Sequence, residues 1–348
     1  MIDKQKKTTL KDIAKKSGVS ISTVSMVLRG DGNISTEVSS KILTIAKELG
    51  YQRKEPKDTI RPPVYITLIE YESFDYQWNF IKPFILAISQ ELRKSNIHTI
   101  FYHLDRKHPD LEDLMASVKN SNSKVVCSIQ YFNEAFFDRL KKELSVNVVL
   151  LNNSVYQEKF SAVCVDDFQG MYNGASFLIN KGHKNFLYFD YTRTELSAIV
   201  ADRYLGFQKA ILENNIDFNE DKQRVTIQLE NLAQNRAIIK NRLEEYPSTT
   251  AIVFHDDYQA SWGLPIIQEL GYNIPNDISV IAPGDTLDFH QPFSPKLTTI
   301  QIDTARMGRM AADLIKKHLS DPLDVYPSVK VIPHIFERQS CKTIESTE

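Results

Sequence analysis

Residues 9–28 read TLKDIAKKSGVSISTVSMVL, and this stretch decides the fold of the N-terminal part of the chain. Thr9 is followed three residues later by Asp12, and apolar residues then recur at helical spacing, which predicts a capped amphipathic helix. Gly18 permits a tight turn, and Ser20 can cap a second helix. Two short helices joined by a tight turn are a helix-turn-helix.

A third helix follows in residues 34–51, ISTEVSSKILTIAKELGY, where Ser35 is the candidate cap and Gly50 a natural stop. The charged residues are also unevenly distributed along the chain. Residues 1–54 carry 11 Lys and Arg against 5 Asp and Glu, whereas the whole chain of 348 residues has a formal net charge of −2. A small basic module on an acidic body suggests a polyanionic partner.

The two stretches resemble the LacI/GalR family of transcriptional regulators across the whole module. In that family the second helix enters the major groove of DNA, where its outward side chains read bases while flanking polar groups hold phosphates. The resemblance implies base contacts by Ile21, Ser22 and Met26. It implies phosphate contacts by Thr9, Ser20, Thr23, Ser25 and Asn33. The alternative is that Ser20, Thr23 and Ser25 only cap and solvate the helix.

Two positions depart from the family pattern. Many relatives carry Arg where this chain has Met26, so we expect more apolar contact with a thymine methyl group and a different operator preference. After Tyr51, relatives have an Ala-Arg-x-Leu hinge helix whose leucine wedges into the minor groove, whereas residues 52–63 here read QRKEPKDTIRPP. Ile60 is the candidate wedge, but the prolines disfavour a helix, so DNA kinking by the 55–63 hinge or linker is in doubt.

From residue 64 onward, β-branched and aromatic runs such as VYITLIE and KVVCSIQ alternate with amphipathic helical stretches. This alternation predicts an α/β fold with parallel sheets flanked by helices, and the length predicts two lobes. The body also resembles the effector and dimerisation domain of the same family, which is similar to periplasmic sugar-binding proteins. We expect it to span residues 64–340. The first lobe is expected at about 64–160 and 290–320, and the second at about 161–289 and 321–340.

The cleft between the lobes is the expected ligand site, because pockets lie beyond the carboxyl ends of parallel strands. Residues 202–211, DRYLGFQKAI, resemble the family's Arg-x-x-Gly-Phe helix, and 254–264, FHDDYQASWGL, resemble its Asn-Asp-x-x-Ala strand end. The resemblance implies that Arg203 and Asp257 bind the effector. A guanidinium donor and a carboxylate acceptor suit neighbouring sugar hydroxyls or a ribose. The alternative is an interlobe ion pair without a ligand.

Further effector contacts are expected from a turn and from aromatic residues. Asp285 matches the second Asp of a family turn, although Pro283 and Gly284 replace the residues before it. Residues 70–80, EYESFDYQWNF, are unusually aromatic, and aromatic faces stack on sugar rings or bases. The candidates for stacking are Phe74, Trp78 and Trp262. The alternative is that they pack the lobe or a dimer interface.

Several classes of protein are excluded or disfavoured. The sequence has no GxSxG, GxxxxGK[ST] or HExxH motif, so we expect no enzyme. The three cysteines Cys127, Cys164 and Cys341 lie far apart, which predicts buried hydrophobic residues and neither a disulfide framework nor a metal site. We expect no cofactor. No apolar run could span a bilayer, and the charged N-terminus lacks a secretory core, so a cytoplasmic location is expected.

The sequence therefore predicts a homodimeric, sequence-specific DNA-binding regulator, with repression as the expected sign. Its operator affinity is expected to depend on a small molecule, most simply a sugar, in the cleft. A symmetric dimer would read a near-palindromic operator. The alternatives are a regulator of the same fold that responds to a nucleoside-type ligand or a partner protein, and a pure ligand-binding protein.

Overall fold

The computed structural model describes residues 8–29, 34–49, 51, 63–71, 78–105, 108–131, 133–153, 158–191, 198–227, 231–286, 295–321 and 327–344. The chain divides into two compact units, Met1–Pro62 and Pro63–Glu348. Within the described residues no helix is both long enough and apolar enough to cross a membrane.

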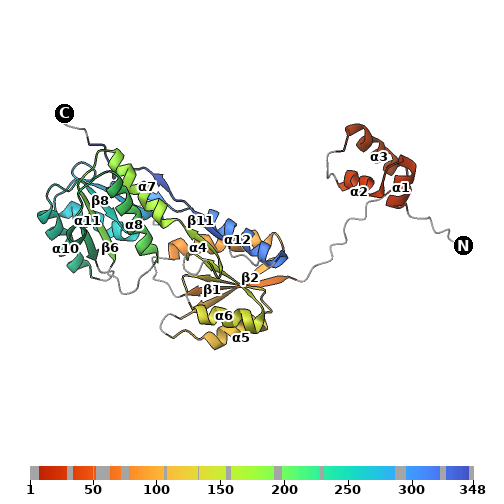
Figure 1. Ribbon diagram of the computed structural model, residues 1–348, viewed down its shortest axis with the longest axis horizontal. Helices are drawn as coiled ribbons and strands as arrows, with labels where there is room; N and C mark the ends of the chain where they lie inside the picture. The colour runs from red at the N-terminus through yellow and green to blue at the C-terminus, as the bar shows by residue number, and fades with distance from the viewer. Residues whose placement is uncertain are drawn as a thin grey trace. The chain divides into compact units, whose positions relative to one another are not determined.

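The N-terminal unit contains the three predicted helices (Figure 1). They are α1 (Leu10–Ser17), α2 (Ile21–Arg29) and α3 (Thr36–Glu48). Ile13, Val24 and Ile42, one from each helix, are fully buried in a shared core, which explains the helical spacing of the apolar positions. Gly18 ends α1 in the left-handed conformation, with φ of 77°, as a tight turn requires. The helix-turn-helix is thus built as the sequence predicts.

The first lobe of the body is a six-stranded parallel sheet with the order β11-β5-β4-β3-β1-β2. Its strands are β1 (Val64–Tyr71), β2 (Ile97–Leu104), β3 (Val125–Ile129), β4 (Asn147–Leu151), β5 (Ser161–Val165) and β11 (Ser328–Val331). One face is covered by α4 (Trp78–Arg93) and α12 (Thr304–Ser320), and the other by α5 (Leu111–Asn120) and α6 (Glu134–Leu144). Since both faces are covered, strands such as β3 and β5 are buried at every position.

The second lobe has the same design, with the sheet order β12-β10-β9-β8-β6-β7 (Figure 1). Its strands are β6 (Phe186–Tyr191), β7 (Arg224–Ile227), β8 (Ala251–Phe254), β9 (Ser279–Gly284), β10 (Thr298–Gln301) and β12 (His334–Phe336), of which β12 is antiparallel. Helices α7 (Asp167–Asn180) and α8 (Ala198–Glu213) cover one face, and α10 (Leu232–Glu245) and α11 (Asp257–Glu269) the other. The short α9 (Glu220–Gln223) precedes β7.

The expected lobe bounds are wrong at three strands. β5 pairs with β4 in the first sheet, β10 pairs with β9 in the second, and β11 pairs with β5 in the first. The chain therefore passes between the lobes after β5, after β10 and after β11, so that α7 covers the second sheet and α12 the first. An apolar run identifies a strand, but its partner is set by pairing with distant segments, which local sequence does not encode.

The three cysteines are free and buried, as the sequence predicts. Cys127 lies in the core of the first lobe, and Cys341 packs in the core of the second. Burial disfavours the thiolate and raises the pKa of Cys164 and of Cys341 to about 11. The three cysteine side chains therefore serve as apolar packing groups inside the lobes.

Candidate functional site

Helix α2 presents an outward face made of the residues expected to read bases. Val24 is fully buried against α1 and α3, which turns Ile21 and Ser22 outward. The Ile21 side chain is 47% exposed, and Met26 is half-buried on the same helix. The exposed side of α2 is therefore the side on which the predicted base contacts lie, and base contact itself stays a prediction.

The small hydroxyl residues around α2 already serve as caps. The backbone N–H of Thr23 donates to the Ser20 hydroxyl at 3.1 Å, and the Ser20 hydroxyl lies 2.6 Å from that of Ser22. The Thr9 N–H and hydroxyl both donate to the Asp12 carboxylate, at 2.8 and 2.7 Å. Ser20 therefore caps α2, and Thr9 and Asp12 form the capping box of α1. Phosphate contact by the hydroxyl residues stays a prediction. Asn33 and Ile60 lie outside the described residues.

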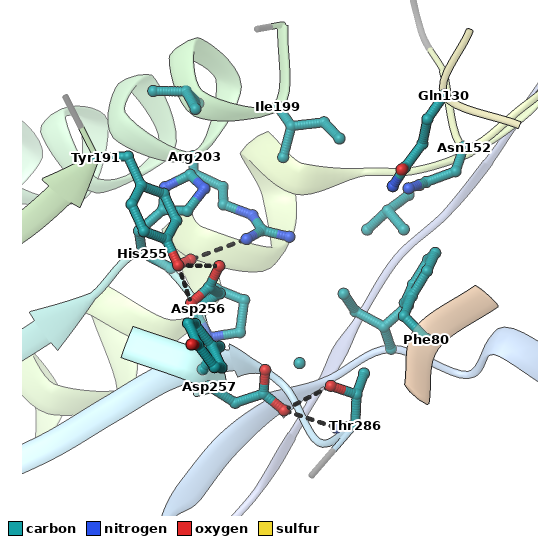
Figure 2. A pocket seen from close by; sticks show the side chains of 16 residues that line it. Phe80, Gln130, Asn152, Tyr191, Ile199, Arg203, His255, Asp256, Asp257 and Thr286 are labelled. Atoms are coloured by element: carbon teal, nitrogen blue, oxygen red, sulfur yellow. Dashed lines mark hydrogen bonds between the residues drawn. The ribbon is translucent and has the colours of Figure 1, made fainter. Parts of the chain in front are cut away.

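A cavity of about 210 Å³, partly open to solvent, lies between the two lobes of the body (Figure 2). The first lobe contributes residues at the carboxyl ends of its strands, including Gln130 after β3 and Asn152 after β4. The second contributes Tyr191, at the end of β6, and residues 255–258, after β8. This is the place where open parallel sheets bind ligands.

Arg203, on α8, projects into this cavity from the second lobe (Figure 2). Its Nε donates to Asp167 at 2.7 Å, and its Nη1 donates to the backbone carbonyl of His255 at 2.8 Å. Burial alone would lower the pKa of Arg203, but the negative charges of Asp167 and Asp256 outweigh burial and raise it. The guanidinium is thus held charged and in one orientation. The predicted interlobe ion pair with Asp257 is not what holds it.

Asp257 is the first residue of α11 and is 4% exposed. Its carboxylate accepts hydrogen bonds from the Thr286 backbone N–H at 2.7 Å and from the Thr286 hydroxyl at 3.0 Å. Gly284 makes this arrangement possible. It has φ of 134°, and a Cβ there would lie 2.3 Å from the Asp257 Cγ atom. The absence of a side chain at Gly284 therefore leaves space for the carboxylate.

The neighbouring Asp256 caps α11 by accepting from the Gln259 N–H at 2.8 Å. It also accepts from the Tyr191 hydroxyl, at 2.9 Å to each carboxylate oxygen (Figure 2). Behind this wall, the Nδ1 atom of His255 lies 3.3 Å from the buried Asp190 carboxylate, without hydrogen-bond alignment. The second lobe therefore lines the cavity with polar side chains that hydrogen bonds hold in place.

The Asp190 carboxylate is held from its other side by Arg224. The Arg224 Nη2 donates to it at 2.6 Å, and the guanidinium carbon lies 3.4 Å from the centre of the Tyr204 ring. Arg224 also pairs with Glu220 at 3.0 Å. A buried carboxylate is stable when it is paired and hydrogen-bonded in this way.

The wall of the first lobe carries two amides and an aromatic ring. Gln130 and Asn152 have φ of 59° and 52°, in the left-handed region that non-glycine residues rarely adopt. Both side chains point into the cavity opposite Arg203, and Phe80 lies beside them (Figure 2).

Three of the predicted effector contacts do not line the cavity. Trp78 is 44% exposed on α4, and Trp262 packs against the core of the second lobe. The Asp285 carboxylate instead forms an ion pair with the Arg338 Nη2 at 2.6 Å and accepts a hydrogen bond from the Gln301 Nε2 at 2.5 Å. Phe74 lies outside the described residues. Of the predicted set, the structure brings Arg203 and Asp257 together on one cavity.

Sequence reasoning missed Phe80, Gln130, Asn152, Tyr191, His255 and Thr286. Gln130 and Asn152 did carry a signal, because each is the first polar residue after an apolar strand. Tyr191 also ends a strand. His255 lies two residues before the candidate Asp257, and Thr286 directly follows the candidate Asp285.

Two family models match the chain. Residues 9–54 match bacterial regulatory proteins of the lacI family, and residues 175–341 match a periplasmic binding protein-like domain. The HTH-type transcriptional repressor PurR of Histophilus somni (strain 129Pt) is 25% identical, over 97% of this chain and 99% of that protein. The HTH-type transcriptional regulator GalR of Streptococcus thermophilus is 25% identical, over 96% of this chain and 99% of that protein.

Solved structures show the same architecture. The transcriptional regulator CelR in complex with cellobiose superposes with a TM-score of 0.68 at 19% identity, over 96% of this chain and 100% of that chain. The lac repressor dimer bound to operator and the anti-inducer ONPF superposes with a TM-score of 0.65 at 18% identity, over 97% of this chain and 100% of that chain. At these identities the likeness establishes the fold.

A helix-turn-helix module followed by a two-lobed body with a cleft defines a DNA-binding transcriptional regulator with an effector domain. The chain belongs to the LacI family of these regulators. Its relatives are transcriptional regulators and not enzymes, in agreement with the sequence prediction.

Proposed function

We propose that the protein represses transcription and that a sugar bound between the lobes controls its affinity for operator DNA. The observation that carries the proposal is the convergence of Arg203 and Asp257 with Gln130 and Asn152 on one cavity (Figure 2). Guanidinium and amide groups donate, carboxylates accept, and a sugar hydroxyl does both, so neighbouring hydroxyls satisfy both walls. Phe80 supplies an aromatic face for the apolar side of a ring.

Relatives support a carbohydrate as the class of ligand. The CelR structure holds cellobiose, and a LacI family regulator from Enterococcus faecium, with a TM-score of 0.65 at 20% identity, holds bound ribose. Relatives named PurR are as similar in sequence as the one named GalR. A nucleoside-type ligand therefore belongs in the same experimental panel.

The DNA-reading face is proposed to be the outward side of α2. Ile21, Ser22 and Met26 would contact base edges, and the hydroxyl residues at its start would contact phosphates. One short helix reads few base pairs, so a homodimer would bring two copies to half-sites roughly 34 Å apart on a near-palindromic operator. The relation between the two sites is thermodynamic linkage, so effector and operator change each other's affinity by the same factor.

The first experiment is thermal unfolding of the purified full chain against sugars, sugar phosphates and nucleosides. A ligand at 100 times its dissociation constant adds roughly 2.7 kcal/mol of stability. The test variant is Asp257→Asn, which keeps the shape of the side chain but removes its charge. The matched control is Asp285→Asn, because Asp285 directly precedes Thr286, the hydrogen-bond partner of Asp257, but does not itself line the cavity.

A shift with one sugar that is lost in Asp257→Asn and kept in Asp285→Asn supports the cleft. A shift with a nucleoside instead would change the class of effector. If no compound stabilises the protein, or if Asp257→Asn responds as the native chain does, the proposal is wrong and a protein signal takes its place. Operator binding with and without the active compound then gives the sign of control.

A further inference from the structure

A second cavity, of about 380 Å³, lies at the end of the second lobe away from the cleft. Tyr191, which lines the cleft, ends β6, whereas Lys184 and Asn185, which line this cavity, precede the same strand. β6 has six residues, so the two cavities are roughly 17 Å apart along it. The second cavity is therefore separate from the proposed effector site, and it falls within the size range of small-molecule sites, roughly 300–1,000 Å³.

Three chain segments form this second cavity, and each precedes one of three neighbouring strands. The strands β8, β6 and β7 are adjacent in the sheet. Lining residues come from 184–185, before β6, from 246–249, before β8, and from 214–217, between α8 and α9 and so before β7. The cavity is therefore built at the amino ends of the strands, whereas the cleft lies at their carboxyl ends.

Hydrogen bonds hold the three segments together. The Gln223 Nε2 donates to the Phe186 carbonyl at 2.9 Å, and its Oε1 accepts from the Asn219 N–H at 2.7 Å. The Thr250 N–H donates to the Asn185 carbonyl at 3.0 Å. Because both carbonyls belong to the start of β6, the walls of the cavity are connected to the sheet and not to a single loop.

Two helices end at this cavity. α8, of 16 residues, ends at Glu213, and α10, of 14 residues, ends at Glu245. Asn214 and Tyr246, the next residues along the chain, both line the cavity. The C-terminal end of a helix carries a partial negative charge that favours a cation near its last turn, and Asp217 adds a full negative charge. These groups together favour a positively charged group of a ligand.

Lys184 gives the cavity the opposite charge and is the one cation among the described lining residues. Both Lys184 and Asp217 are exposed, and within the part of the chain that the structure describes neither has an ion-pair partner. A ligand with a single charge would be attracted by one of the two and repelled by the other. A ligand that carries both charges satisfies both residues.

The rest of the lining is polar. Asn185, Asn215 and Ser248 carry amide and hydroxyl groups, which both donate and accept hydrogen bonds. A carboxylate needs several donors and an ammonium group several acceptors, so groups of this kind complete the binding of either. Ile216 is the one aliphatic residue among the described lining residues, so the cavity offers little apolar surface to a ligand.

We propose that this cavity binds a free α-amino acid, with the ligand carboxylate at Lys184 and the ligand ammonium group near Asp217 and the two helix ends. The amide and hydroxyl side chains supply the remaining hydrogen bonds. Because the lining is polar, an amino acid with a short polar side chain fits best. The proposal concerns a different cavity from the effector cleft and does not rest on the proposed function.

The experiment uses the full-length protein with the twenty common amino acids as probes. Thermal unfolding with each probe at about 10 mM detects any site with a millimolar dissociation constant, because a bound ligand stabilises the folded state. Calorimetry then gives the dissociation constant of each probe that stabilises the protein. We expect a small polar amino acid to bind. Its N-acetyl and carboxamide derivatives, which lack the ammonium and the carboxylate charge, should bind about three- to tenfold more weakly.

Two variants each remove one charge from the cavity and keep a side chain of similar size, Lys184→Met and Asp217→Asn. Both residues are exposed, so we expect both variants to fold. Each should weaken amino-acid binding by about three- to tenfold. The matched controls are Lys222→Met and Asp221→Asn, which remove the same charges from exposed positions of α9 that do not line the cavity. The controls should bind as the native chain does.

Asp257→Asn, in the cleft, distinguishes the two cavities and should leave amino-acid binding unchanged. Binding that is lost in Asp257→Asn and kept in Lys184→Met would place the ligand in the cleft and overturn the proposal. Native affinity in both Lys184→Met and Asp217→Asn would overturn it as well, and so would stabilisation by none of the amino acids. The sugar panel tests the proposed function separately, so a failure to bind sugars leaves this proposal intact.

Discussion

Replacing Gly284 with alanine should weaken the proposed effector site, and the structure gives the size of the effect. A Cβ at this position would lie 2.3 Å from the Asp257 Cγ atom and 2.5 and 2.6 Å from its two oxygens. Ordinary contact begins near 3.4 Å, so the carboxylate must retreat by about 1 Å. That movement disrupts the hydrogen bonds of 2.7 and 3.0 Å from Thr286. Hydrogen bonds to charged groups are worth about 1.5–3 kcal/mol each.

Backbone strain adds to this loss, because an L-residue rarely adopts the Gly284 φ of 134°. Such strain costs on the order of 1–3 kcal/mol. With part of the Thr286 interaction retained after relaxation, we expect the free energy of unfolding to fall by about 4 kcal/mol. Gly271→Ala is the matched control, because Gly271 has φ of 95° but no described atom within 4 Å of the place that an alanine methyl group would take. Gly271→Ala should therefore lower the free energy of unfolding only by the cost of the backbone strain.

The assay is urea unfolding of both variants, followed by effector binding under conditions in which both are folded. The difference between the variants, about 2–3 kcal/mol, isolates the contact with Asp257 from the strain. We also expect Gly284→Ala to lose at least about tenfold in effector affinity, since one misplaced charged hydrogen-bonding group costs that much. Equal destabilisation of the two variants, or full effector affinity in Gly284→Ala, would refute the reasoning.

Three further predictions concern other parts of the molecule. Met26→Arg should change operator preference at one position per half-site, whereas replacing an exposed lysine of the module with alanine should weaken binding to all sequences alike; selection on randomised operators separates the two. Arg203→Ala should cost about 3–5 kcal/mol because it strands the buried Asp167, and adding Asp167→Ala should recover part of the loss in denaturant titrations. Burial lowers the pKa of His183, so the folded state binds a proton at this residue less readily than the unfolded chain does. The free energy of unfolding should therefore have its full value above about pH 6.5 and fall as the pH drops below that value. Denaturant titrations at several pH values should show a less steep fall in His183→Gln.

The fold was largely predictable because both sheets are covered on two faces. That arrangement makes strands such as β3 and β5 nearly continuous apolar runs, which stand out between amphipathic helices. The lobe to which β5, β10 and β11 belong was not predictable in the same way. The pairing of β11 with β5 joins segments more than 160 residues apart, and a strand of four residues carries little information about its partner.

The candidate site was predictable where a local motif carries it, as for Arg203 and Asp257. Two of the aromatic candidates, Trp78 and Trp262, do not line the cavity, for reasons of helix geometry. Trp78 and Phe80 are two positions apart on α4, which is about 200° around the helix, so the residue facing the cavity is Phe80. Trp262 follows Asp257 by five positions, about 140° around α11, and packs on the sheet instead.

The turn at Gly284 links the effector wall to the segment that joins the lobes. The Gly284 backbone lies close to the Asp257 carboxylate on one side. On the other side, the Gly284 carbonyl accepts a hydrogen bond from the Ile302 N–H at 3.1 Å. Ile302 lies between β10 of the second sheet and α12 of the first lobe, and it also lines the cavity. We therefore expect a ligand that moves Asp257 to act, through Gly284, on this crossing between the lobes. For this reason Gly284→Ala should alter the response of operator affinity to effector beyond the loss in effector binding itself, a difference that operator titrations at saturating effector would measure.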